Sequence, residues 1–298
     1  MRRLKKFWIL FLATSFLRAN DIQTPTTQLP LYIEFGPCAE CNYCHVIQYN
    51  LFPIFVALTQ IQRNRTFAEN VIYCNKYPFK QEVFKLISDC PIKEAPYDPA
   101  TMYNLAFGFP YENKELCARY FSPFLSQLYE RFNIKPQEAR THKITITLVQ
   151  RTGRCRQITN LENLCQALNT YCARKNYVLN VVHLEKASFN YQLQLMANTD
   201  VLIACHGAAM TNGAFIRNNG LVIEIFPYGF KYELFHLFIT NCRPDVMYHR
   251  WTLGQKECLP TTAKSKIKGL EFRYWRDQNI RVSPDRLIDL LDHLCKKH

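Results

Sequence analysis

The stretch Val201 to Gly229 constrains the fold more than any other part of this chain. It reads VLIACHGAAMTNGAFIRNNGLVIEIFPYG, so a short apolar run, a turn of small residues and a second apolar run follow one another closely. Apolar runs of this length are typical of strands buried inside a parallel sheet. We therefore expect strands at 201–205 and 221–226, joined by a turn and by a helix that begins near Ala208.

The turn at His206, Gly207 and Ala208 suits a small anion. Its small side chains would let a ligand approach the backbone, and a helix that begins there would aim unpaired N–H groups at the ligand. A plain packing junction between strand and helix is the alternative. His206 favours the anion site, because open α/β sheets bind ligands at the carboxyl ends of their strands. Glu224 lies on a buried strand and needs a partner, either a ligand hydroxyl or a basic or amide group of the protein.

Strands and helices alternate through the rest of the chain. In the first half we expect strands at 31–35, 71–74 and 102–109 and helices at 45–61, 79–88 and 115–132. In the second half we expect further strands at 144–149 and 177–184 and helices at 161–174 and 189–198. Such alternation predicts an α/β fold with parallel sheets and right-handed crossovers. Neither a GxGxxG nor a GxxxxGKS/T sequence is present, which argues against a dinucleotide-binding dehydrogenase and a P-loop protein.

The two halves predict two α/β domains, at 20–138 and 139–298. A polar stretch that contains Pro136 lies where they join and makes a plausible hinge. The second domain ends in a helix that Ser283 can cap. An apolar stripe runs along this helix, formed by Leu287, Ile288, Leu290, Leu291 and Leu294. The helix either caps its own sheet or crosses back to the first domain.

Residues 1–19 predict entry into the secretory pathway. A basic start precedes an apolar run that is short for a bilayer span, so a cleaved signal peptide is favoured over a short signal anchor in the membrane. We expect the chain in the lumen of the endoplasmic reticulum or Golgi, or secreted, with N-glycosylation at Asn64. The 13 cysteines then predict several disulfides and at least one free thiol, for which Cys205 is our choice.

The charge distribution and the cysteine spacing limit which molecules and ions this chain is expected to bind. The formal net charge of +13 is spread along the chain instead of forming a stripe, so we expect no nucleic-acid partner. A polyanionic glycan or a nucleotide diphosphate suits the sign of the charge better. Cys38, Cys41 and Cys44 have the spacing of metal ligands, but no second ligand cluster with a standard spacing follows. We therefore expect disulfides there and no metal site.

Three motifs, taken together, resemble glycosyltransferase family 61. The run CHGAAMTNGAF at 205–215, followed by VIEIFPYGF at 222–230, is similar to the signature of this family. The segment LVQRTGRCRQITN resembles the family's strand and arginine loop, with Arg151 and Arg156 at the places of its two arginines. Asn42-Tyr43-Cys44-His45, with Pro53 eight residues further on, resembles its amino-terminal motif.

This resemblance implies a GT-B fold, in which two Rossmann-like parallel-sheet domains enclose a cleft. It also implies an inverting transfer of a sugar, N-acetylglucosamine or xylose, from a UDP-sugar to a glycan or glycoprotein acceptor. The UDP-sugar is a substrate, and no cofactor is expected. The residues that would bind the donor diphosphate without a metal are Arg151, Arg156, His206, Gly207 and Ala208. The residues that would line the nucleoside side are Glu224, Phe226 and Tyr228.

The acceptor side departs from the family's pattern. Many relatives have a carboxylate four residues after the histidine that corresponds to His45, where it could act as general base, but this chain has Tyr49 there. Either His45 or another group then takes the acceptor proton, or the chain binds without turnover. The alternative function is therefore a non-catalytic glycan-binding or nucleotide-binding relative in the lumen or outside the cell.

Overall fold

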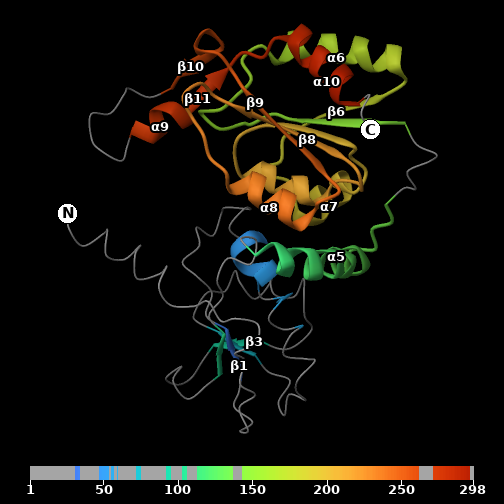
Figure 1. Cartoon of the computed structure of the whole chain (residues 1–298), viewed down its shortest axis with the longest axis vertical. Coiled ribbons are helices and arrows are strands. Elements are labelled where there is room, and N and C mark those ends of the chain that lie inside the picture. The colour runs from blue at the N-terminus through green and yellow to red at the C-terminus, as the bar shows by residue number, and fades with distance from the viewer. Residues whose placement is uncertain are drawn as a thin grey trace. The chain divides into compact units, whose positions relative to one another are not determined.

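The chain divides into two compact units, Met1–Leu128 and Tyr129–His298. The computed structural model in Figure 1 describes residues 31–33, 47–53, 55, 56, 59, 72–74, 92–94, 103–105, 113–136, 143–261 and 271–295. The segment 1–19, the helix expected at 79–88, His45 and Asn64 lie outside the described residues. The domain boundaries expected from the sequence stay predictions.

The described part of the first unit contains a parallel sheet of four short strands in the order β3-β2-β1-β4. These strands are β1 (Leu31–Ile33), β2 (Ile72–Cys74), β3 (Ile92–Glu94) and β4 (Tyr103–Leu105). Helical segments include the π-helix η1 (Ile47–Leu51), the helical residues Phe52 and Pro53 that follow it, and most of α5 (Lys114–Arg131). The ring of Phe52 packs 5.3 Å from that of Phe121 and 5.4 Å from that of Phe124, so aromatic contacts form the core between these helical segments.

The second unit contains a five-stranded parallel sheet in the order β6-β5-β7-β8-β9. The strands are β5 (Thr145–Val149), β6 (Val178–Val182), β7 (Val201–Cys205), β8 (Leu221–Phe226) and β9 (Met247–Thr252). Every residue of β7 and β8 is buried, as expected for central strands with apolar side chains on both faces. The strand order reverses between β5 and β7, and such sheets bind ligands beyond the carboxyl ends of the strands at this point.

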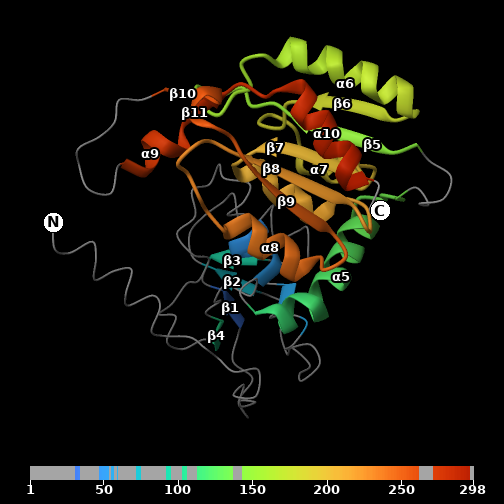
Figure 2. The same ribbon diagram turned by 45° about the horizontal axis from the view of Figure 1, so that its top comes forward.

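Helices cover both faces of this sheet. In Figures 1 and 2, α6 (Leu161–Lys175) and α10 (Pro284–Cys295) lie together on one face, and α7 (Phe189–Met196) and α8 (Leu234–Cys242) lie on the other. The α/β class and the parallel Rossmann-like sheet expected from the sequence are therefore confirmed. Among the described residues, no helix combines the length and apolar content that crossing a bilayer requires.

The terminal helix α10 packs within its own unit. Leu287, Leu291 and Leu294 are buried in the core that α6 and the sheet also line. Tyr171 of α6 donates a hydrogen bond of 3.1 Å to Asp292 of α10. Of the two placements left open by the sequence, capping its own sheet is the one that the structure has.

The segment after the turn differs from the expected α-helix. Residues Ala208–Phe215 form a 3₁₀-helix, η4, which ends at Phe215 because Ile216 is extended. Thr211, Asn212 and Gly213 have weak α-helical preferences, so little in the sequence opposes the tighter winding. A Cβ at Gly213 would lie 2.6 Å from Cδ1 of Ile239 in α8, so the absence of a side chain on this glycine lets η4 pack closely on that helix.

A small antiparallel ribbon completes the second unit. It pairs β10 (Cys258–Pro260) with β11 (Gln278–Ile280), and it is flanked by η5 (Gln255–Glu257) and α9 (Glu271–Arg276). The N–H group of Ile280 donates to the carbonyl oxygen of Gln157 at 2.8 Å. This contact holds the ribbon beside the basic loop that follows β5.

Candidate active site

The candidate site lies at the point where the strand order reverses. β5 ends at Val149 and is followed by the basic loop that contains Arg151 and Arg156, whereas β7 ends at Cys205 and is followed by the turn at 206–208. Because β5 and β7 are parallel neighbours, the loop and the turn meet at the same edge of the sheet. The structure thus brings together all the residues that the sequence assigned to the diphosphate.

Gly207 lets two guanidinium groups approach the backbone of the turn. Its φ angle is 156°, in a region that residues with a Cβ rarely adopt. A Cβ at this position would lie 2.5 Å from Nη1 of Arg151 and 3.1 Å from Nη1 of Arg156. Gly207 precedes η4 and has no side chain that could cap it, so N–H groups at the start of this helix are suited to bind a ligand.

The half-buried guanidinium of Arg151 has no partner among the described residues. Its guanidinium makes no hydrogen bond or salt bridge with the part of the chain that the structure describes, and its Nε atom is buried. Burial and the positive charge of Arg156 lower the pKa of Arg151. An unpaired cation in such a place is costly, and an anion in front of the turn would stabilise it.

Arg156 is held in place by its neighbours. Its Nη1 donates to the carbonyl oxygen of His206 at 3.0 Å, and its Nε lies 3.6 Å from Oδ1 of Asp277. The φ angle of Arg156 is 62°, which is uncommon for a residue with a long side chain. Asp277 also accepts hydrogen bonds from Arg276, from Nε at 2.6 Å and from Nη2 at 2.7 Å. One carboxylate therefore orients two guanidinium groups beside the turn.

His206 and Glu224 form a buried pair at the turn. Nδ1 of His206 lies 2.6 Å from Oε1 of Glu224, and the hydroxyl of Tyr248 donates to Oε2 of the same carboxyl group. His206 is 4% exposed and Glu224 is completely buried. Of the two kinds of partner that the sequence left open for Glu224, the structure has protein groups. A contact between Glu224 and ribose hydroxyls stays a prediction.

Burial opposes charge on both members of this pair. Burial lowers the pKa of His206 to about 3, and the nearby Arg156, Arg276, Arg151 and Arg250 act in the same direction. Burial also raises the pKa of Glu224 well above its ordinary value, although Arg250 acts against this. Burial therefore favours the uncharged form of both side chains.

Aromatic side chains surround the imidazole of His206. The rings whose centroids lie between 4.8 and 5.8 Å from it are Phe226, Phe230, Tyr232 and Phe235. Phe226, expected on the nucleoside side, is completely buried and contacts His206. Tyr228 is 39% exposed, and its ring lies 6.0 Å from that of Trp275. Of these two aromatic residues, Tyr228 is the one with surface left for a ligand.

The acceptor-side residues are not part of this site as the structure describes it. Tyr49 belongs to the π-helix η1 in the first unit, and its side chain lies outside what the structure describes. His45 lies outside the described residues altogether. Their roles stay predictions.

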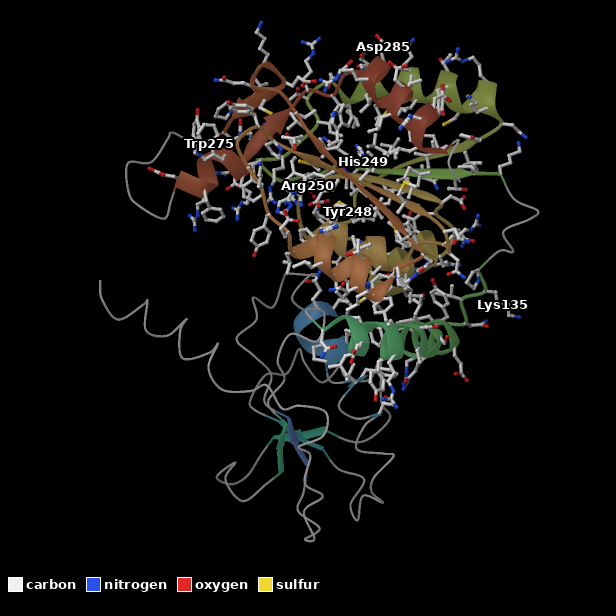
Figure 3. All side chains as sticks on the ribbon, in the orientation of Figure 1. Lys135, Tyr248, His249, Arg250, Trp275 and Asp285 are labelled. Carbon is white, nitrogen blue, oxygen red and sulfur yellow. The ribbon has the colours of Figure 1, made fainter. Side chains whose placement is uncertain are left out.

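Sequence reasoning missed three residues of the site: Tyr248, Arg250 and Asp277. Tyr248 and Arg250 lie two residues apart on β9, so both point to the face covered by α8, whereas His249 points to the other face (Figure 3). Arg250 lies 5.0 Å over the ring of Phe226 and is paired with Glu233. Alternation along MYHRWT could have indicated a strand with these two side chains on one face. Nothing in the sequence indicates Asp277.

Comparison with known proteins agrees with this arrangement. The family model described as Glycosyltransferase 61 matches residues 43–223. Similar curated proteins are named EGF domain-specific O-linked N-acetylglucosamine transferase. The Bos taurus protein is 24% identical over 201 residues, which are 67% of this chain and 31% of that protein. The Gallus gallus protein is 27% identical over 201 residues, 67% of this chain and 30% of that protein. The matched region is thus less than a third of the length of either relative.

Proposed function

This chain belongs to glycosyltransferase family 61, and we propose that it transfers a sugar from a UDP-sugar to a glycan or glycoprotein acceptor in the secretory pathway. The observation that carries the proposal is the unpaired guanidinium of Arg151 against the glycine turn at the switch point of the sheet. A half-buried cation beside free backbone donors is suited to a diphosphate.

The chemistry of sugar transfer requires a group that stabilises the leaving nucleoside diphosphate. Arg151 and Arg156 can form bidentate hydrogen bonds with phosphate oxygens, and the turn at Gly207 and Ala208 offers neutral N–H donors. These groups can supply the stabilisation that a metal ion gives in other enzymes. We therefore propose an inverting, metal-independent reaction without a cofactor.

The names of the relatives suggest the donor. Proteins named as O-linked N-acetylglucosamine transferases match 67% of this chain, so UDP-N-acetylglucosamine is the first donor to test, with UDP-xylose as the second. The acceptor would be a hydroxyl group of a protein or of its glycan. Tyr228 is exposed near the site and is suited to contact the nucleoside.

The GT-B arrangement and the acceptor side belong to the same proposal. Each unit contains a parallel sheet, as a GT-B fold requires. His45 would take the acceptor proton in place of the carboxylate that Tyr49 replaces. Location in the endoplasmic reticulum or Golgi lumen, processing or anchoring of residues 1–19, disulfides and a glycan on Asn64 complete the proposal.

A non-catalytic binding protein is the second candidate, and Tyr49 favours it. Release of UDP from UDP-N-acetylglucosamine or UDP-xylose, measured with the purified chain and an array of glycoprotein acceptors, separates the two functions. Turnover that Arg151→Ala abolishes would support the enzyme. Tight UDP-sugar binding without turnover, with turnover gained on Tyr49→Asp, would support the non-catalytic protein.

A further inference from the structure

Three side chains, from Tyr248, Glu224 and His206, form a continuous series of contacts at the site. The hydroxyl of Tyr248 donates to Oε2 of Glu224, and Oε1 of Glu224 lies 2.6 Å from Nδ1 of His206. Glu224 is completely buried and His206 is 4% exposed, so solvent barely reaches these two side chains, whereas Tyr248 is partly buried. Both oxygens of the carboxyl group are used by protein partners. Glu224 therefore has a role that does not require contact with a ligand.

The second ring nitrogen of His206, Nε2, is available to a ligand. Nδ1 of His206 is engaged by Glu224, whereas Nε2 has no hydrogen-bond partner among the residues that the structure describes. The surrounding aromatic rings can offer little to a polar atom at their edges. The carbonyl oxygen of His206 is bound by Arg156, and the next residue, Gly207, contacts Arg151 and Arg156. The backbone that carries the imidazole thus lies next to the place where an anion would bind.

Whether Glu224 and the neutral imidazole of His206 together hold two protons or one decides what Nε2 can do. If Glu224 carries the proton, it donates to Nδ1, and the neutral imidazole must then carry its own proton on Nε2. If Glu224 is ionised, Nδ1 donates to the carboxylate, and Nε2 presents a lone pair that would repel phosphate oxygens. Burial raises the pKa of Glu224 and lowers that of His206, so both groups favour their uncharged forms. The positive charge of Arg250 acts to lower the pKa of Glu224, but Arg250 is itself paired with Glu233.

We propose that Glu224 and Tyr248 are positioning residues that hold His206 with its proton on Nε2, so that this N–H group donates to an oxygen of the donor diphosphate. Tyr248 keeps Oε2 of Glu224 occupied as acceptor and thereby directs the acidic proton of Glu224 to Oε1 and Nδ1. That the ligand is a diphosphate rests on the proposed function. That Nε2 of His206 carries a proton in the ligand-free chain does not depend on the proposed function.

The first test is nuclear magnetic resonance of the free chain with ¹⁵N-labelled histidine, with the signals of His206 assigned by their loss in His206→Asn. The expected result is a protonated Nε2 and an unprotonated Nδ1 at neutral pH. A protonated Nδ1, with or without a proton on Nε2, would overturn the proposal. The result does not depend on whether the chain binds UDP.

The second test compares UDP affinities of two variants at Glu224. Glu224→Gln can still donate to Nδ1 from its amide nitrogen and accept from Tyr248 with its oxygen, so it should bind UDP within about threefold of the unaltered chain. Glu224→Leu removes both contacts and should weaken binding about tenfold or more. Equal losses in the two variants would show that the charge of Glu224 matters, and would contradict the proposal.

Tyr248→Phe provides a milder test with a matched control. It should weaken UDP binding about threefold to tenfold and shift the ¹⁵N signals of His206. Tyr171→Phe removes a tyrosine hydroxyl that also donates to a carboxylate, Asp292, on the face covered by α6 and α10, and it should change neither measurement. If the ¹⁵N signals of His206 are unchanged in Tyr248→Phe, Tyr248 does not help to position the proton, and that part of the proposal is contradicted. If the unaltered chain does not bind UDP, the proposed function fails, and the proton position is judged by the first test alone.

Discussion

The guanidinium of Arg151 lies against the backbone of Gly207, so closely that a Cβ on this glycine would be 2.5 Å from Nη1. This guanidinium has no hydrogen-bond or salt-bridge partner in the described part of the chain. Gly207 in turn adopts a φ angle of 156°, which other residues rarely tolerate. The two residues together form the proposed seat for the diphosphate.

Substitution of Gly207 should therefore impair binding as well as stability. In Gly207→Ala, the new methyl group displaces the guanidinium of Arg151, and we expect UDP binding to weaken about tenfold. The unusual backbone conformation should also lower the free energy of unfolding by about 1–3 kcal/mol. Calorimetry and urea unfolding measure the two effects. Gly153→Ala, in the same basic loop with no atom within 4 Å of a new Cβ, is the control and should leave UDP affinity unchanged.

Asp277 should make the fold sensitive to acid. Burial raises the pKa of Asp277, but hydrogen bonds and charge from Arg276 outweigh this effect, so the pKa lies below its ordinary value. A carboxylate of this kind stabilises the fold above its unfolded pKa of about 3.9, and the stabilisation is lost as pH falls through the folded pKa. Urea unfolding between roughly pH 5 and pH 2 should therefore show a smaller loss of stability in Asp277→Asn than in the unaltered chain.

The control for Asp277 is Asp289→Asn, on the exposed side of α10, which should keep the acid sensitivity of the unaltered chain. Asp277→Asn should also weaken UDP binding about threefold to tenfold, because Arg156 loses an ion-pair partner. If stability falls with pH in Asp277→Asn in the same way as it does in the unaltered chain, protonation of Asp277 does not contribute to the acid sensitivity, and the prediction is contradicted.

Cys205 should be unreactive in the folded chain. It is 2% exposed, its thiol is free, and burial raises its pKa to about 12. Iodoacetamide at pH 8 should leave Cys205 unmodified until urea unfolds the protein, because the thiolate is the reactive form. Mass spectrometry of the digested protein measures this. Modification of Cys205 at the rate of the partly exposed Cys155 would contradict the buried position.

Metal removal should not affect the reaction. Arg151, Arg156 and the N–H groups of the turn are proposed to bind the diphosphate, so no cation is required. Sugar transfer in the presence of excess EDTA should proceed at the rate measured without it, and added Mg²⁺ or Mn²⁺ should not increase that rate. Loss of transfer on chelation, restored by one of these ions, would contradict the metal-independent reaction.

The sequence predicted the central part of the fold because its strands are continuous apolar runs. Val201–Cys205 and Leu221–Phe226 are buried on both faces, and such runs can be recognised without knowledge of their neighbours. Arg151 and Arg156 could be assigned because their loop directly follows a strand. β9 escaped notice because it lies at the edge of the sheet, where polar residues replace the apolar run.

Other features depend on contacts between distant segments. The partner of Glu224 could not be predicted, because Tyr248 reaches it only through the pairing of β8 with β9. Asp277 comes to Arg156 only because the ribbon formed by β10 and β11 lies beside the basic loop. The free thiol of Cys205 agrees with the structure, whereas the disulfides expected elsewhere stay predictions.

Calorimetric titration of the chain with UDP, UDP-N-acetylglucosamine and UDP-xylose, with Arg151→Ala and Arg154→Ala in parallel, tests the central claim most directly. Arg154 lies in the same loop but is exposed, so it provides a matched loss of charge. We expect at least one ligand to bind, Arg151→Ala to weaken this binding at least about tenfold, and Arg154→Ala to change it by less than about threefold. No binding by the folded chain, or equal losses in the two variants, would contradict a diphosphate site at Arg151.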